Sequence, residues 1–197
     1  MQTYAKAETL TGAWLAPVDW VKSTALVVAF SLFVALSAQV VIPLPFTPVP
    51  ITLQTFAVLL TGALLGSRLG AAALTLYLSE GMLGLPFFQG GNGGWLYLAF
   101  SPTAGYLLAY PLAAFLTGTL AERGWDRKFP TAAAAIAIGS CVVLFGGWLG
   151  LLRFFPATEA FTRGVVPFVI GDIVKVALAA AALPSGWALL RKTGRKD

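Results

Sequence analysis

Long runs of hydrophobic residues, separated by short segments that hold most of the polar residues, dominate the sequence. A run of about 20 apolar residues is long enough to cross a bilayer as a helix. The runs here are continuously apolar rather than alternating, which excludes a transmembrane β-barrel. We therefore predict an all-α polytopic membrane protein, a single integral membrane domain over residues 1–197 with six transmembrane helices. The predicted spans cover residues 21–42, 52–66, 69–85, 103–121, 131–152 and 167–190.

The overall composition supports a membrane protein. Of the 197 residues, 58% are hydrophobic and 11% are charged, whereas a soluble domain is about 45–50% apolar and about 25% charged. Residues 1–19 are mixed polar and lack the apolar core of a signal peptide. The first apolar run is therefore expected to be an uncleaved span.

The basic residues predict the orientation, because cytoplasmic loops carry an excess of Lys and Arg. With both termini placed in the cytoplasm, the outer segments hold only Arg153 and Arg163, and Lys175 lies within a span. The net charge of +5 then reflects topology in the cell (inner or plasma) membrane, with some attraction to anionic lipid, and does not indicate a nucleic-acid partner. The inner segments hold ten basic residues: Lys6, Lys22, Arg68, Arg123, Arg127, Lys128, Arg191, Lys192, Arg195 and Lys196.

The last predicted span contains an acid and a base, Asp172 and Lys175. Positions three apart lie on one face of a helix, so the two side chains should point the same way. Charged groups inside a bilayer are costly, and they usually mark a functional site. The pair is either a structural pair that fixes helix packing or part of a polar ligand site in the outer half of the membrane. Glu80 also lies in a span, and either an interfacial carboxylate or a ligand contact fits it.

The outer loops differ from the inner ones. Residues 43–50 include four prolines and no charge, which predicts a stiff segment that continues neither neighbouring helix. Residues 86–102 combine glycines with aromatic side chains, and glycine allows a close approach of the backbone to a ligand. The two uncharged loops together predict a lid, with ordinary turns as the simpler alternative. A third outer loop, residues 153–164, contains Glu159.

Several function classes have no support in the sequence. There is no histidine and only one cysteine, Cys141, so the usual metal ligands and the commonest general base are missing. We expect no catalytic residues, no metal site, no cofactor and no enzymatic activity. No phosphate-binding loop of the Gly-x-x-x-x-Gly-Lys-Ser/Thr type occurs. If transport is driven by ATP, the ATPase is a different polypeptide.

The first span carries small residues one helical turn apart, Ala25 and Ala29. Such spacing lets two helices approach backbone to backbone. It predicts either packing inside the protein or a docking surface for another membrane protein.

Four segments in order resemble the BioY family, the biotin-binding S components of energy-coupling factor (ECF) transporters. They are Pro-Val-Pro-Ile-Thr-Leu-Gln-Thr-Phe at 48–56, Gly-Leu-Pro-Phe-Phe at 84–88 with its glycine-rich continuation, Ser-Pro-Thr-Ala-Gly-Tyr-Leu-Leu at 101–108, and Pro-Phe-Val-Ile-Gly-Asp-Ile-Val-Lys at 167–175. Ser101 and Ala104 stand where glycine is usual in the family. Both changes are conservative in size.

The resemblance implies the six-helix S-component fold with cytoplasmic termini and capture of biotin from the outer side. It also implies two kinds of protein partner, a transmembrane coupling protein (EcfT-like) and ABC ATPases (EcfA-like). S components contact the coupling protein through small residues on the first helix, and Ala25 and Ala29 are the matching positions here. The alternative without these partners is a stand-alone secondary transporter, coupled to protons through Asp172 or Glu80. An intramembrane enzyme is a third, remote alternative.

The resemblance assigns Asp172 and Lys175 to the biotin site. The cyclic urea of biotin needs both a hydrogen-bond acceptor and a donor, which a carboxylate, an ammonium group and side-chain amides can provide. Which end of biotin faces the charged pair stays open. From loop position and chemistry, further substrate contacts are expected from two amides and four aromatic rings: Gln54, Asn92, Phe87, Phe88, Trp95 and Tyr106.

Overall fold

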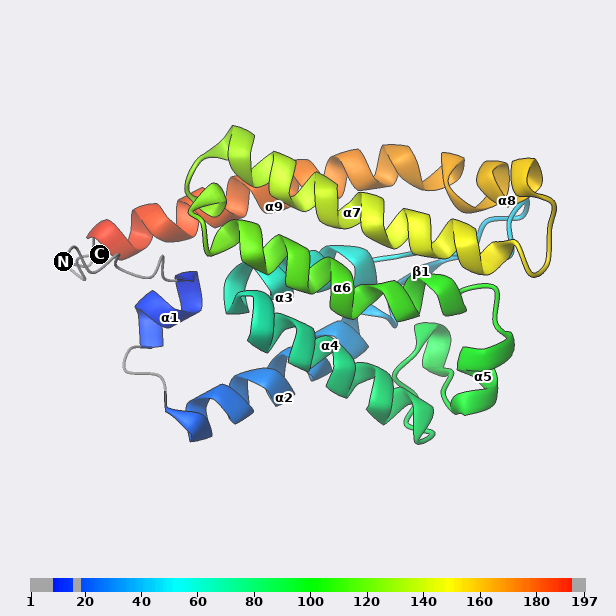
Figure 1. Ribbon diagram of the computed structural model, residues 1–197, viewed down its shortest axis with the longest axis horizontal. Helices are drawn as coiled ribbons and strands as arrows, with labels where there is room; N and C mark the ends of the chain where they lie inside the picture. The colour runs from blue at the N-terminus through cyan, green and yellow to red at the C-terminus, as the bar shows by residue number, and fades with distance from the viewer. Residues whose placement is uncertain (1–8, 16–18, 193–197) are drawn as a thin grey trace.

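The computed structural model describes residues 9–15 and 19–192, and in these ranges the chain is almost entirely helical (Figure 1). The short helices are α1 (Leu10–Leu15), η1 (Gln89–Gly91), α5 (Trp95–Phe100), η2 (Trp125–Arg127) and α8 (Ala157–Gly164). The long helices are α2 (Trp20–Ser37), α3 (Gln54–Leu65), α4 (Ser67–Met82), α6 (Ala104–Ala121), α7 (Phe129–Leu151) and α9 (Val166–Lys192).

The prediction of an all-α protein is confirmed, and each predicted span overlaps one of the long helices. In the described residues, four segments are long and apolar enough to cross a membrane: α2, α6, α7 and the continuous stretch of α8 and α9. Helices α3 and α4 have 12 and 16 residues, which is short for a full crossing. The count of six spans and the location of the termini therefore stay predictions.

Large apolar side chains lie on the outer surface of the long helices. Leu36 of α2 is 71% exposed, Phe145 of α7 58% and Ile170 of α9 77%. A soluble protein rarely exposes so much contiguous apolar surface. Surrounding lipid gives these side chains an apolar environment, as expected for an integral membrane protein.

The structure differs in detail from the predicted spans and loops. The first span was predicted to run to residue 42, but α2 ends at Ser37 and residues 41–42 form a strand. The outer loop at 153–164 contains α8, and the loop at 86–102 contains η1 and α5. A search for long apolar runs detects membrane spans but misses short helices, whose sequence signal covers only one or two turns.

The proline-rich segment is the turn of a short hairpin. Strand β1 (Val41–Ile42) pairs antiparallel with β2 (Ile51–Thr52), with Val41 opposite Thr52. The turn is held against the chain far downstream, because the Thr47 hydroxyl donates a 2.8 Å hydrogen bond to the carbonyl oxygen of Arg163. The turn is thereby fixed at the end of the bundle that carries α8 (Figure 1).

Helix α6 packs against α3, α4 and α7 and occupies the middle of the bundle (Figure 1). Glycines allow the backbones to approach closely. A β-carbon at Gly105 of α6 would lie only 2.8 Å from the Cα of Gly150 on α7, and one at Gly62 of α3 would lie 2.8 Å from the Cα of Ala114 on α6. Small residues at such crossings are typical of helices packed in membranes.

At the opposite end of the bundle, polar side chains tie the short connections to the helices. The Trp187 indole on α9 donates a 2.6 Å hydrogen bond to Asp126 in η2, and burial raises the pKa of that carboxyl. The carboxylate of Glu122 accepts hydrogen bonds from the backbone N–H and the hydroxyl of Ser67, and so caps the start of α4. The short connections at this end are therefore anchored to the helices by buried hydrogen bonds.

Replacing Gly105 with valine should destabilise the protein by about 1–3 kcal/mol, because the new side chain forces apart the closely packed α6 and α7. Thermal unfolding in detergent measures the change. Gly171→Val is the matched control, since nothing lies within 4 Å of a β-carbon at that helical glycine. Equal losses in both variants would contradict the role of the α6–α7 contact.

Candidate ligand-binding site

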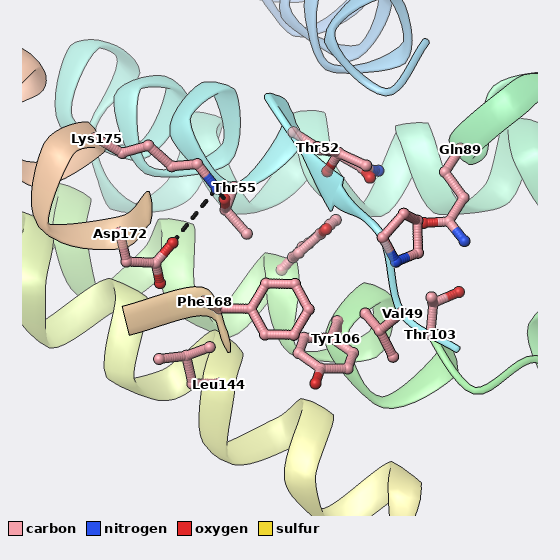
Figure 2. Close-up of a pocket in the computed structure, with 13 residues that line it drawn as sticks. Val49, Thr52, Thr55, Gln89, Thr103, Tyr106, Leu144, Phe168, Asp172 and Lys175 are labelled. Carbon is pink, nitrogen blue, oxygen red and sulfur yellow. Dashed lines mark hydrogen bonds and ion pairs between the residues drawn. The ribbon is translucent and has the colours of Figure 1, made fainter. Parts of the chain in front are cut away.

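A pocket lies between the hairpin and the first turns of α3, α6 and α9 (Figure 2). The empty space among its lining residues is about 410 Å³, part of which is open to solvent. Thirteen residues line it: Val49, Pro50, Thr52, Gln54, Thr55, Gln89, Thr103, Tyr106, Tyr110, Leu144, Phe168, Asp172 and Lys175.

The acid and the base of α9 are the charged groups of this lining (Figure 2). Asp172 Oδ1 and Lys175 Nζ are 3.3 Å apart, and their side chains are 10% and 13% exposed. The prediction that the two residues share one helix face is confirmed. A buried charge is strongly unfavourable without a partner, so the contact between the two residues offsets part of the cost of burying both.

Two other helices also hold the charged pair. Lys175 Nζ donates a 2.6 Å hydrogen bond to Thr55 Oγ1 of α3, and the Ser140 hydroxyl of α7 donates to the other carboxylate oxygen of Asp172. Hydrogen bonds to charged groups are stronger than those between neutral groups. The positions of both charges therefore depend on the packing of α3, α7 and α9.

Aromatic and amide side chains form another part of the lining. Tyr106 donates a hydrogen bond from its hydroxyl to the carbonyl oxygen of Gly164, and its ring centre lies 6.1 Å from that of Phe168. Gln54 is only 2% exposed, and its amide nitrogen donates to the hydroxyl of Tyr77. The pocket thus combines flat apolar walls with fixed hydrogen-bonding groups.

Of the eight substrate contacts expected from the sequence, the structure brings Gln54, Tyr106, Asp172 and Lys175 together in this pocket. The other four do not line it. Phe88 is fully buried, with its ring centre 5.6 Å from that of Tyr97.

The other three expected contacts that do not line the pocket are Phe87, Asn92 and Trp95, which belong to the segment that leads into α5. Asn92 donates from its side chain to the carbonyl oxygen of Gln89, 2.7 Å away. Trp95 is 62% exposed at the start of α5, and Phe87 packs against the hydrophobic core. In this arrangement Phe87 and Phe88 support the loop above the pocket and do not form part of the pocket wall.

Sequence reasoning missed most of the lining. Thr52 and Thr55 belong to the 48–56 segment that carries the family resemblance. The resemblance therefore included part of the pocket lining, although these two residues were not named. Leu144 and Ser140 had no detectable signal, because α7 is apolar along its whole length. The neglected lining residues are Val49, Pro50, Thr52, Thr55, Gln89, Thr103, Tyr110, Leu144 and Phe168.

The helical bundle is apolar and encloses a paired acid and base next to amide and aromatic groups. These features are typical of one class of protein, a membrane protein that binds a small polar ligand. No group of three or more His, Cys, Asp or Glu side chains that could hold a metal ion occurs in residues 9–15 and 19–192. The polar groups that line the pocket can form hydrogen bonds and pair with charges.

The chain belongs to the BioY family, whose family model matches residues 5–192. It is a transport protein and not an enzyme. It is 38% identical over 158 residues to a probable biotin transporter BioY of Pyrococcus horikoshii, covering 80% of this chain and 91% of that one. It is 40% identical over 162 residues to the biotin transporter BioY of Rhodobacter capsulatus, covering 74% of this chain and 82% of that one.

A solved structure is also similar. The crystal structure of the S-component for biotin from an ECF-type ABC transporter superimposes with a TM-score of 0.74 at 26% sequence identity. The match covers 90% of this chain and 93% of that chain. The S-component fold expected from the resemblance is therefore the fold of this chain.

Replacing Thr55 with valine should lower the free energy of unfolding by about 1.5–3 kcal/mol, because Lys175 loses a short hydrogen bond to its charged group. Thermal unfolding in detergent without ligand measures the loss. Thr61→Val is the matched control, because that buried hydroxyl on the same helix bonds only to the carbonyl oxygen of Ala57. Similar stability of the two variants would show that Thr55 does not hold the ammonium group.

Proposed function

We propose that this chain is the substrate-binding S component of an ECF transporter and that it captures biotin from the outer side of the cell membrane. The observation that carries the proposal is the buried Asp172–Lys175 pair, which lines the pocket of a protein of the BioY family. Relatives named as biotin transporters, and the similar S-component for biotin, support this choice of substrate.

The chemistry of the pocket suits biotin. The carboxylate of Asp172 accepts hydrogen bonds from N–H groups, and the ammonium group of Lys175 donates to a carbonyl or carboxylate oxygen. Tyr106 and Phe168 offer apolar surface for the ring system and the aliphatic chain. In this proposal, biotin replaces part of the contact between Asp172 and Lys175, and Thr55 and Ser140 keep the two charges in position.

The proposed topology has six spans and both termini in the cytoplasm. The pocket then lies in the outer half of the membrane, below the proline-rich turn and the 86–94 loop. The charge distribution supports this orientation, because ten basic residues fall on the proposed inner side and two on the outer side.

The proposed energy source is a pair of separate ABC ATPases that act through a transmembrane coupling protein. The sequence has no phosphate-binding loop of its own. Helix α2 is the proposed contact with the coupling protein, because Ala25 and Ala29 are both exposed one turn apart. Ala35 and Ala38, further along the chain, are buried inside the bundle.

The purified chain should bind biotin without any partner, as measured by isothermal titration calorimetry. Asp172→Asn and Lys175→Met should each weaken binding by about 30-fold or more, because truncating one member of a buried charge pair costs about 2–5 kcal/mol. Glu159→Gln is the control, since that carboxylate forms an exposed ion pair with Arg163 on α8. Unchanged affinity in both pocket variants would refute the site, and absence of binding by the unaltered chain would refute the function.

Replacing Ala25 and Ala29 with leucine should abolish co-purification with the coupling protein while the affinity for biotin stays unchanged. The larger side chains prevent a close approach of two helices. The control is Ala72→Leu, at an exposed alanine on α4. Biotin uptake into liposomes that hold this chain alone, driven by a proton gradient, would instead favour a secondary transporter.

A further inference from the structure

The side-chain amide of Gln54 is held by a residue outside the pocket. Tyr77 of α4 is fully buried, and its hydroxyl oxygen lies 2.5 Å from Gln54 Nε2. The same hydroxyl lies 3.1 Å from the carbonyl oxygen of Phe87, in the loop above the pocket. The three groups form one continuous chain of hydrogen bonds from the pocket to the loop.

The number of protons that each of the three groups can donate fixes the direction of each hydrogen bond. A tyrosine hydroxyl has a single proton to donate, and a backbone carbonyl oxygen can only accept. The proton of Tyr77 must therefore point to Phe87, which leaves the tyrosine oxygen to accept from Gln54. The NH₂ group of Gln54 then faces Tyr77, and its carbonyl oxygen, Oε1, is the end of the amide left for the pocket.

The carbonyl oxygen of Gln54 is a free acceptor in the described part of the chain. No residue in 9–15 or 19–192 donates a hydrogen bond to it, and it is not among the buried atoms that lack both a partner and solvent contact. This oxygen therefore keeps solvent contact, and an amide oxygen can accept a hydrogen bond from a donor that enters the pocket. A ligand N–H group in the pocket would find a free acceptor there.

The aromatic groups around Tyr77 fix its position. The ring centre of Phe88 lies 5.8 Å away in an edge-to-face arrangement, and the ring of Tyr97 stacks on the other side of Phe88. A β-carbon at Gly81 would collide with the Phe88 ring, so the cluster has no room to shift toward α4. This packing holds the Tyr77 hydroxyl where it bonds to both Gln54 and the carbonyl oxygen of Phe87.

We propose that Tyr77 is a positioning residue for ligand specificity. By accepting from the amide nitrogen of Gln54, it turns Gln54 Oε1 toward the ligand, where that oxygen accepts a hydrogen bond from an N–H group. This inference rests on the proposed function, in which the donor is one N–H of the cyclic urea of biotin. It predicts selection for ligands with a donor at this point and against analogues of the same shape without one.

A double-mutant cycle on biotin affinity tests the inference, because it isolates the coupling between two residues. Tyr77→Phe and Gln54→Met should each weaken biotin binding about tenfold, as expected for one lost or misdirected hydrogen bond. The double variant should bind no more weakly than Gln54→Met alone, since Tyr77 acts only through the amide. Tyr97→Phe removes a hydroxyl from the same aromatic cluster and should be additive with Gln54→Met.

A ligand series separates recognition of the N–H group from a general loss of structure. Gln54→Met should weaken biotin and desthiobiotin by the same factor, because both carry the urea, and should not change the affinity for biotin methylated at the recognised urea nitrogen. Gln54→Glu keeps an acceptor and should retain more affinity than Gln54→Met. A structural role alone would weaken all ligands equally.

The outcomes distinguish this inference from the proposed function. Additive effects of Tyr77→Phe and Gln54→Met, in a chain that binds biotin, would overturn the role of Tyr77 and leave the function intact. Equal weakening of methylated and unmodified biotin by Gln54→Met would do the same. An unaltered chain that binds neither biotin nor desthiobiotin would overturn both.

Discussion

The buried charges on α9 are the constraint on which the pocket depends. An ammonium group and a carboxylate in a largely apolar bundle are stable only as a pair with further hydrogen bonds. Thr55 of α3 and Ser140 of α7 provide those bonds. Three helices must therefore keep one relative position, and the pocket lies where they meet. Because burying a charge without partners is costly, the need for these partners fixes the geometry of the pocket.

Close packing of the helix backbones makes this meeting possible. Gly105 of α6 lies against Gly150 of α7, and Gly62 of α3 lies against Ala114 of α6. Lipid gives little hydrophobic drive for helices to associate, so van der Waals contact between small residues contributes much of the packing energy. The small residues and the charged pair thus act together, because the small residues set the spacing of the helices and the charged pair lies between them.

The two segments above the pocket are held by specific bonds. The proline-rich turn is fixed by Thr47 to the end of α8. The 84–94 loop is fixed by Phe88, which inserts into the cluster with Tyr77 and Tyr97. Through Gln54 and Tyr77, the pocket and this loop share one chain of hydrogen bonds. The lining of the pocket and the position of the loop are consequently linked by a few buried polar atoms.

The sequence alone determined the helical class, the approximate extent of each long helix, and the common face of Asp172 and Lys175. These features depend on local rules, namely the length of apolar runs and the periodicity of a helix. It did not identify α8, because a short helix leaves a weak signal. The tertiary structure alone decided that Thr55 and Ser140 hold the charges, that Phe88 supports a loop, and that the amide of Gln54 bonds to Tyr77. The hydrogen bonds among these contacts join residues 23 to 120 positions apart, and no local pattern encodes which distant side chain completes a hydrogen bond.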